Sequence, residues 1–172
     1  MMIKVCPLHE QQKILTKTKG FWALSAMSAA ETNFDLPLNG HSWLALAQAV
    51  FNEQTSRWDV TTCGGGMRWQ AYSFLAGWAL KNSISNGIYF QLGARLARFT
   101  GNDTYAQLAA RTFDWMETVS LIDKQYNVYD NSQADGLNCS QVDHNQWSYN
   151  AGTMLIGAAY MYNYVSYDLD IC

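Results

Sequence analysis

Charged residues are scarce in this chain of 172 residues. Lys and Arg total 11 and Asp and Glu total 14, so charged residues make up 15% and the formal net charge is −3. An average soluble domain has about 25% charged residues. A mildly acidic chain without a basic stripe is poorly suited to neutralise a phosphate backbone. We therefore expect no nucleic-acid partner.

Long apolar runs, a secretory leader and paired metal-binding cysteines are also missing. The longest apolar candidate, residues 21–30, is interrupted by serines and is shorter than the roughly 18 residues of a membrane span. The first ten residues lack the apolar core and the cleavage site of a signal peptide. The four cysteines, Cys6, Cys63, Cys139 and Cys172, show no C-x-x-C spacing. The sequence therefore predicts no transmembrane span, no metal and no cofactor.

Aromatic residues, by contrast, are abundant. The chain has 7 Trp, 10 Tyr and 7 Phe, and its hydrophobic content of 49% excludes disorder. Its 12 Gly and 2 Pro exclude a collagen-like or low-complexity chain. The length suits a single domain.

Most long segments have helical periodicity. The clearest apolar stripe comprises Tyr105, Leu108, Ala109, Thr112, Phe113 and Met116. A second stripe comprises Ile88, Leu92, Leu96 and Phe99. Between them, residues 101–103 supply a glycine stop and then N-cap residues, so the two stripes predict a helical hairpin.

An earlier hairpin is predicted from a helix over 21–31, a connection over 33–40 and a second helix. The apolar positions of that second helix are Trp43, Ala47, Val50, Phe51 and Trp58. A fifth helix over about 147–164 contains small residues that would let a neighbouring helix approach closely. Strand signals are nearly absent. The pattern predicts an all-α fold of about two and a half hairpins, either a superhelical solenoid or, favoured by the low charge, an incomplete helical barrel.

Two long loops, 59–80 and 122–145, are expected to carry function. The segment 63–70 contains three consecutive glycines but lacks the Lys and Ser/Thr of a phosphate-binding loop. It is either a flexible turn or a backbone that lies close to a ligand, with Arg68 donating hydrogen bonds and Trp69 stacking.

Two further clusters combine polar and aromatic residues. Asn82 and Asn86 are four residues apart and share a helix face with Lys81 at its edge, although simple capping is the alternative. Residues 146–150 place a tryptophan among amides, and a buried core tryptophan is the alternative there. Indoles, amides and hydroxyls together suit a sugar, which has apolar C–H faces and a rim of hydroxyls. The clusters therefore predict carbohydrate binding.

Glycoside hydrolysis requires two carboxyl groups, about 5–5.5 Å apart in retaining enzymes. Asp114 and Glu117 share a helix face but are expected to be solvated. Asp59 and Asp130 lie in or beside the two long loops and are better candidates, although nothing in the sequence brings them together.

Several ordered motifs strongly resemble glycoside hydrolase family 76, and in particular its fungal mannan endo-1,6-α-mannosidases. The motifs are Trp43–Asn52, Arg57–Asp59, Cys63–Gln70, Lys81–Asn86, Ala94–Asn102 and Gln146–Gly152. The resemblance implies an (α/α)6 barrel, present here in part over residues 20–165, with unmatched segments at 1–19 and 166–172. It also implies a retaining glycosidase that hydrolyses or transglycosylates α-1,6-mannan in fungal cell-wall biogenesis, in a secreted, plasma-membrane or cell-wall location.

The resemblance also implies that the catalytic pair is missing. Family members carry two adjacent aspartates before a Gln-x-x-Trp helix start, and here those positions are Lys17 and Thr18, with Lys19 in place of the glutamine. Neither can act as a general acid or as a carboxylate nucleophile. We therefore expect a truncated and inactive copy. The alternatives are a non-catalytic mannan-binding remnant and, less favoured, a helical protein-interaction scaffold.

Several residue roles follow from the same resemblance. It implies substrate contacts to α-1,6-mannan, or another mannosylated glycan, from Arg68, Trp69, Lys81, Asn82, Asn86, Asp130, Trp147 and Asn150. It also implies a disulfide between Cys63 and Cys139. Independently of the family, two N-x-[ST] sequons predict glycosylation at Asn102 and Asn138, which favours a secretory route.

Overall fold

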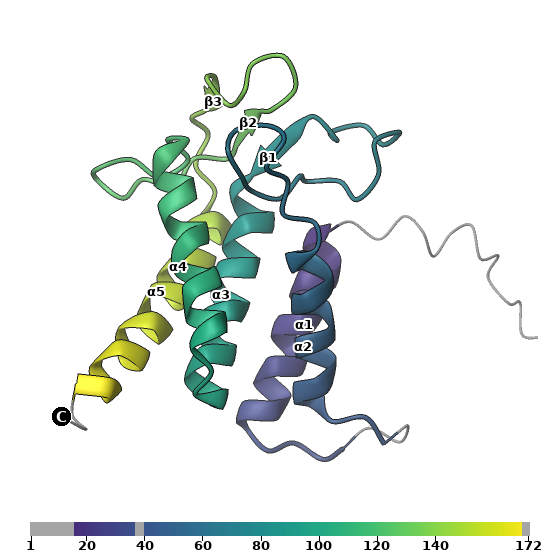
Figure 1. The fold of residues 1–172 in the computed structure, drawn as a ribbon, viewed down its shortest axis with the longest axis vertical. Helices are drawn as coiled ribbons and strands as arrows, with labels where there is room; N and C mark the ends of the chain where they lie inside the picture. Colours follow the sequence, from purple (N-terminus) through teal and green to yellow (C-terminus); the bar gives the residue numbers. More distant parts are fainter. Residues whose placement is uncertain (1–15, 37–39, 170–172) are drawn as a thin grey trace, which may run out of the picture.

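The computed structural model describes residues 16–36 and 40–169, and helices make up most of them (Figure 1). The helices are α1 (Thr16–Glu31), α2 (Trp43–Thr55), α3 (Ser83–Thr100), α4 (Asp103–Thr118) and α5 (Ser148–Leu169). Three short strands, β1 (Leu80–Asn82), β2 (Asn131–Gln133) and β3 (Val142–Asp143), form an antiparallel sheet in that order. Two helical hairpins and a fifth helix confirm the predicted fold class.

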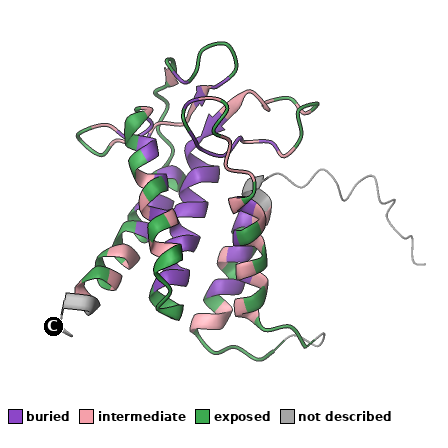
Figure 2. Ribbon diagram, viewed as in Figure 1, coloured by how far each residue is buried: buried purple, intermediate pink, exposed green. Residues whose placement is uncertain are grey.

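Helix α3 is the centre of the molecule and is buried along most of its length (Figure 2). It packs against all four other helices. Its N-terminus is capped by the Asn82 side chain, which accepts a hydrogen bond from the Ser85 N–H at 3.3 Å. Its C-terminus ends at Gly101, whose φ of 69° is left-handed. The capping role considered for Asn82 is therefore confirmed.

Helices α1, α3 and α5 form the inner row of an incomplete barrel. Their N-termini lie at the end that carries the sheet (Figure 1). Arg95 of α3 pairs with Glu31 of α1 at 2.6 Å, and the Tyr160 hydroxyl of α5 donates to the same carboxylate at 3.2 Å. Gly157 lets α5 approach α3, because a Cβ there would lie 2.5 Å from the Phe90 ring. The predicted close approach of the fifth helix is confirmed at this glycine.

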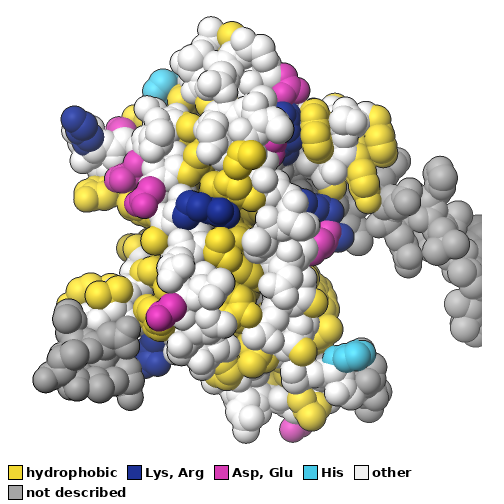
Figure 3. All heavy atoms as spheres, in the orientation of Figure 1, with side chains coloured by type: hydrophobic (Ala, Val, Ile, Leu, Met, Phe, Trp, Pro, Cys, Tyr) yellow, Lys and Arg dark blue, Asp and Glu magenta, His cyan; other side chains and the backbone are white. Residues whose placement is uncertain are grey.

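The two ends of this row expose apolar side chains. On α1, Phe21 and Trp22 are about half exposed, and on α5 Leu155, Tyr162 and Val165 are 72%, 74% and 52% exposed. On the face in Figure 3, hydrophobic side chains are widespread and charged ones are sparse. The row does not close into a ring within the described residues, so these surfaces have no helix packed on them there.

The observed elements differ from the predicted ones mainly at their ends. Helix α1 begins at Thr16 and α5 continues to Leu169, so both helices cross the domain boundaries predicted at 19/20 and 165/166. The inclusion of Trp58 in the second helix was wrong, because α2 ends at Thr55. Trp58 lies instead in the following loop, where its ring meets that of Trp115 at 5.8 Å.

Candidate active site

The two long loops meet above the inner helices and are joined by a disulfide. Cys63 and Cys139 are bonded, with their Cα atoms 5.5 Å apart, which confirms the predicted pairing. The Cys63 N–H also donates to the Asn138 side-chain oxygen. The bond closes a segment of 76 positions and thereby restrains both loops.

The glycines that follow Cys63 lie against tryptophans of the protein. Gly66 has a φ of 88°, and a Cβ there would lie 2.2 Å from the Trp115 ring. A Cβ at Gly65 would lie 2.8 Å from the Trp58 ring. The Trp115 indole N–H donates to the Cys63 carbonyl at 3.0 Å, which fixes the ring under the loop. The close approach that these glycines permit is therefore to the protein's own indoles.

We expect Gly66→Ala to lower the free energy of unfolding by about 3 kcal/mol, because left-handed backbone strain adds to overpacking against Trp115. Gly64→Ala is the matched control, since Gly64 also has a positive φ of 65° but a Cβ added to it would meet nothing within 4 Å. The control should lose only about 1 kcal/mol of its free energy of unfolding. Urea unfolding followed by circular dichroism measures both, and equal losses would contradict the contact with Trp115.

The Lys81 side chain binds the backbone of the same loop. Its ammonium donates to the carbonyls of Asp59, Thr62 and Gly65 at 2.8, 2.7 and 2.6 Å, and lies 3.4 Å from the Asp59 carboxylate. The Lys81 side chain is fully buried. Burial lowers its pKa, and the charge of Asp59 opposes that shift. With three carbonyls and a carboxylate around it, Lys81 fixes the path of the loop.

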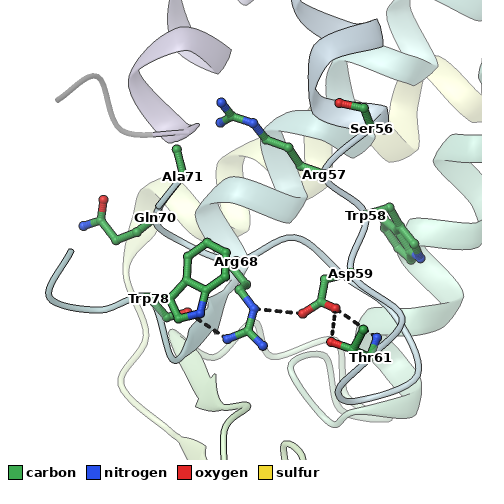
Figure 4. A pocket seen from close by; sticks show the side chains of 9 residues that line it. All are labelled: Ser56, Arg57, Trp58, Asp59, Thr61, Arg68, Gln70, Ala71 and Trp78. Atoms are coloured by element: carbon green, nitrogen blue, oxygen red, sulfur yellow. Dashed lines mark hydrogen bonds and ion pairs between the residues drawn. The ribbon is translucent and has the colours of Figure 1, made fainter. Parts of the chain in front are cut away.

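Arg68 completes this charged cluster at the edge of a cavity of about 320 Å³. Figure 4 shows Arg68 between Trp78 and Asp59; its Nε donates to Asp59 at 2.8 Å and its guanidinium lies 4.7 Å from the Trp78 ring. Burial raises the pKa of Asp59, but hydrogen bonds from Thr61, the charge of Lys81 and a hydrogen bond from Arg68 outweigh it and hold the pKa well below its usual value. The cavity is lined by Ser56, Arg57, Trp58, Asp59, Thr61, Arg68, Gln70, Ala71 and Trp78.

A second, smaller cavity gathers a different set of predicted residues. It has a volume of about 100 Å³ and is lined by Trp69, Leu80, Asn82, Ile84, Asp130, Asn131 and Tyr149. Arg68 and Lys81 pair across a β-bridge. Because successive side chains of extended backbone alternate in direction, Trp69 and Asn82 are directed away from Arg68 and Lys81. The structure thus brings Trp69, Asn82 and Asp130 together and places Arg68 and Lys81 elsewhere.

Asp130 is held in this second cavity by two amides. Its carboxylate accepts from Asn150 Nδ2 at 3.2 Å and from Asn131 Nδ2 at 3.0 Å. The Asn131 amide also lies 3.5 Å from an Asp143 carboxylate oxygen. Burial, followed by the charge of Asp130, raises the pKa of Tyr149. Asp130 is therefore an oriented acceptor beside an indole and a phenol.

Trp147 and Asn86 have different surroundings from each other. Trp147 is 49% exposed and its ring lies parallel to that of Tyr149, with centroids 6.3 Å apart, so the alternative of a core tryptophan is wrong. Asn86 is fully buried, and its amide accepts from the Met67 N–H at 2.8 Å and donates to the Met67 carbonyl at 3.1 Å. Asn86 thus fastens the glycine loop to α3, and its contact with substrate stays a prediction.

The other candidate carboxylates, Asp114 and Glu117, do not line either cavity. Asp114 and Glu117 are exposed on α4, as expected. Lys17 and Thr18 lie in the first turn of α1. Among residues 16–36 and 40–169, no group of three or more His, Cys, Asp or Glu could hold a metal. None of the helices described there is long and apolar enough to cross a membrane.

Comparison with known protein families shows which family this chain belongs to. The sequence profile described as glycosyl hydrolase family 76 matches residues 4–168. The chain belongs to glycoside hydrolase family 76. The matched range starts inside the segment 1–19, which the motifs alone left unmatched. The similarity of this chain to family 76 therefore extends over nearly its whole length.

The family 76 relatives include fungal enzymes. The chain is 48% identical over 161 residues to the mannan endo-1,6-α-mannosidase DCW1 of Candida albicans, with 92% of this chain and 35% of the relative covered. It is 46% identical over 167 residues to DCW1 of Saccharomyces cerevisiae, with 95% and 37% covered. The chain therefore spans little more than a third of the length of these relatives.

Solved structures show the same fold. The crystal structure of Dfg5 from Chaetomium thermophilum in complex with glucosamine matches with a TM-score of 0.84 and 46% identity, covering 89% of this chain and 38% of that one. The α-1,6-mannanase GH76A of Salegentibacter matches with a TM-score of 0.71 and 17% identity, covering 87% and 41%. The latter is an inactive variant, with two consecutive aspartates changed to alanine, in complex with α-1,6-mannotetraose. These matches confirm the incomplete (α/α)6 barrel.

Sequence reasoning missed three residues of the second cavity and its rim. Tyr149 lies inside the predicted cluster 146–150, and the raised pKa that marks it depends on burial and on Asp130, which is 19 positions away. Asn131 and Asp143 face each other across β2 and β3. These strands have three and two residues, mostly polar, and carry no alternating pattern from which their pairing could be predicted.

Proposed function

We propose that this family 76 chain binds α-1,6-linked mannose at the cavity of Trp69, Asn82 and Asp130 and does not hydrolyse it. The observation that carries the proposal is the meeting of an indole, an amide and a fixed carboxylate in one cavity at the N-termini of α3 and α5. The indole suits the C–H face of a pyranose, and the polar groups suit its hydroxyls. The relatives named mannan endo-1,6-α-mannosidases supply the substrate class.

The absence of hydrolysis is inferred from the residues at the family's acid positions. Lys17 offers a cation and Thr18 an unactivated hydroxyl where a nucleophile and a general acid are needed. The Salegentibacter enzyme, with two consecutive aspartates replaced by alanine, is inactive yet holds α-1,6-mannotetraose. Loss of a carboxylate pair is therefore compatible with retained binding in this fold.

We further propose that the protein follows the secretory route towards the plasma membrane or cell wall. A closed disulfide between Cys63 and Cys139 is typical of proteins that mature in an oxidising compartment. The sequons at Asn102 and Asn138 are compatible with the same route.

Titration with α-1,6-mannotetraose tests the binding proposal. We expect saturable binding that Trp69→Ala weakens about tenfold or more, because truncating an aromatic anchor at a binding site typically costs over about 1.4 kcal/mol. Trp22→Ala is the matched control, since Trp22 is 51% exposed on α1 and does not line this cavity. Equal affinities of the two variants would contradict the site, and mannose oligomers released from α-1,6-mannan would contradict the lack of hydrolysis.

A further inference from the structure

The two glycosylation sequons lie in different local structures, although both acceptor asparagines are exposed. Asn102 is the N-cap of α4 and has an extended backbone, with φ −96° and ψ 110°. Its side-chain oxygen accepts from the Thr104 N–H at 2.9 Å, and residues 102–104 are all exposed. The Asn102 sequon therefore lies at the surface of the folded protein, where α4 begins, and has no covalent link to another segment.

The Asn138 sequon is closed into a turn. The N–H groups of Asn138, Cys139 and Ser140 all donate to carbonyls of residues 133–137, at 3.0, 2.9 and 2.9 Å. Both Asn138 and Cys139 have left-handed backbone, with φ of 45° and 62°. The central residue of the sequon, Cys139, is 5% exposed and is disulfide-bonded to Cys63.

The disulfide partner also occupies the acceptor side chain. The Cys63 N–H donates to the Asn138 side-chain oxygen, so one residue holds both the middle of the sequon and its asparagine. A transferase must bind the sequon backbone to reach Asn138 Nδ2. Such binding requires release of the three turn hydrogen bonds, and the covalent bond to Cys63 opposes that release.

We propose that closure of the Cys63–Cys139 disulfide limits N-glycosylation at Asn138, whereas Asn102 is modified irrespective of that bond. In the transfer, Asn Nδ2 loses a proton and bonds to the anomeric carbon of a lipid diphosphate-linked oligosaccharide. The bond from that carbon to the diphosphate breaks, and the lipid diphosphate leaves. In the competing step, an oxidising disulfide of the compartment takes two electrons and two protons from the Cys63 and Cys139 thiols.

The order of synthesis places the two steps in direct competition. Cys63 precedes Asn138 by 138 − 63 = 75 positions, which corresponds to roughly 4–15 s of chain elongation. The partner thiol is therefore already present when the Asn138 sequon emerges. This inference rests on the secretory route proposed above and is independent of mannan binding.

Expression of the full chain of 172 residues behind a cleavable secretion leader in yeast tests the coupling. Total cellular and secreted protein is deglycosylated enzymatically in ¹⁸O water, and occupancy of each asparagine is read by mass spectrometry. We expect high occupancy of Asn102 and low occupancy of Asn138 in the wild type. Cys63→Ser, which leaves the sequon intact, should raise occupancy of Asn138 at least threefold and leave Asn102 unchanged.

Two controls separate the disulfide from other effects. Cys6→Ser removes a cysteine that we expect to lie outside the framework and should change neither site. Gly66→Ala destabilises the same loop while keeping both cysteines, and should leave Asn138 near its wild-type occupancy. A rise with Gly66→Ala equal to that with Cys63→Ser, or equal Asn138 occupancy in wild type and Cys63→Ser, would overturn the coupling. Unmodified Asn102 would overturn the statement that this sequon is modified irrespective of the disulfide, and would leave mannan binding untouched.

Discussion

A chain carrying Lys81→Met should lose about 3–5 kcal/mol of its free energy of unfolding. The methionine keeps most of the length and apolar stem of lysine but removes its ammonium. Three carbonyls of the 59–65 loop would then be left without their donor, and the carboxylate of Asp59 would lose a cation beside it. Removing a buried charged donor leaves its acceptors desolvated and each with one hydrogen bond or ion pair fewer, which is why the effect should be large.

Lys124→Met is the control for this experiment, because Lys124 is exposed in the loop after α4. It removes the same charge with the same side-chain change and should shift stability by less than about 0.5 kcal/mol. Urea unfolding curves of the two variants and the wild type give the comparison. A Lys81→Met curve that overlays the Lys124→Met curve would show that the buried ammonium contributes nothing.

The role of Lys81 also shows where prediction from sequence reached its limit. Its neighbours Asn82 and Asn86 placed it in a polar run typical of a sugar-binding cleft. Lys81 lies in β1, however, and its side chain is directed to the opposite face from that of Asn82. A polar side chain at this position can contact either a ligand or a carbonyl of a neighbouring loop. Which of the two it contacts depends on the pairing of strands about 50 positions apart, between Lys81 and Ser132.

The elements predicted well were those specified by local pattern. The stripes of α3 and α4, the glycine stop at Gly101 and the N-cap at Asn102 all depend on neighbours within a few residues, and each is found in the structure. Trp58 was placed wrongly because it continues a helical stripe, whereas α2 ends at Thr55 and the Trp58 ring packs on Trp115 from the following loop. The disulfide was found through family resemblance, since four cysteines allow three pairings.

Replacing both Cys63 and Cys139 with serine should cost about 4 kcal/mol of unfolding free energy. The bond closes 76 positions, and the chain-entropy relation for a segment of that length gives a loss of this size. Most of the effect acts on the unfolded chain, which becomes less restricted and more expanded. The denaturant slope should therefore rise along with the fall in midpoint.

This expectation has two independent checks. Wild-type protein unfolded in the presence of a reductant should match the double variant, because both lack the same covalent link. Cys6→Ser combined with Cys172→Ser is the matched control, with the same number of cysteines removed, and should leave the midpoint unchanged. If that control lost as much stability as the Cys63 and Cys139 variant, the loop closure would not be the cause. If instead the slope stayed constant while the midpoint fell, the loss would arise in the folded loops rather than in the unfolded chain.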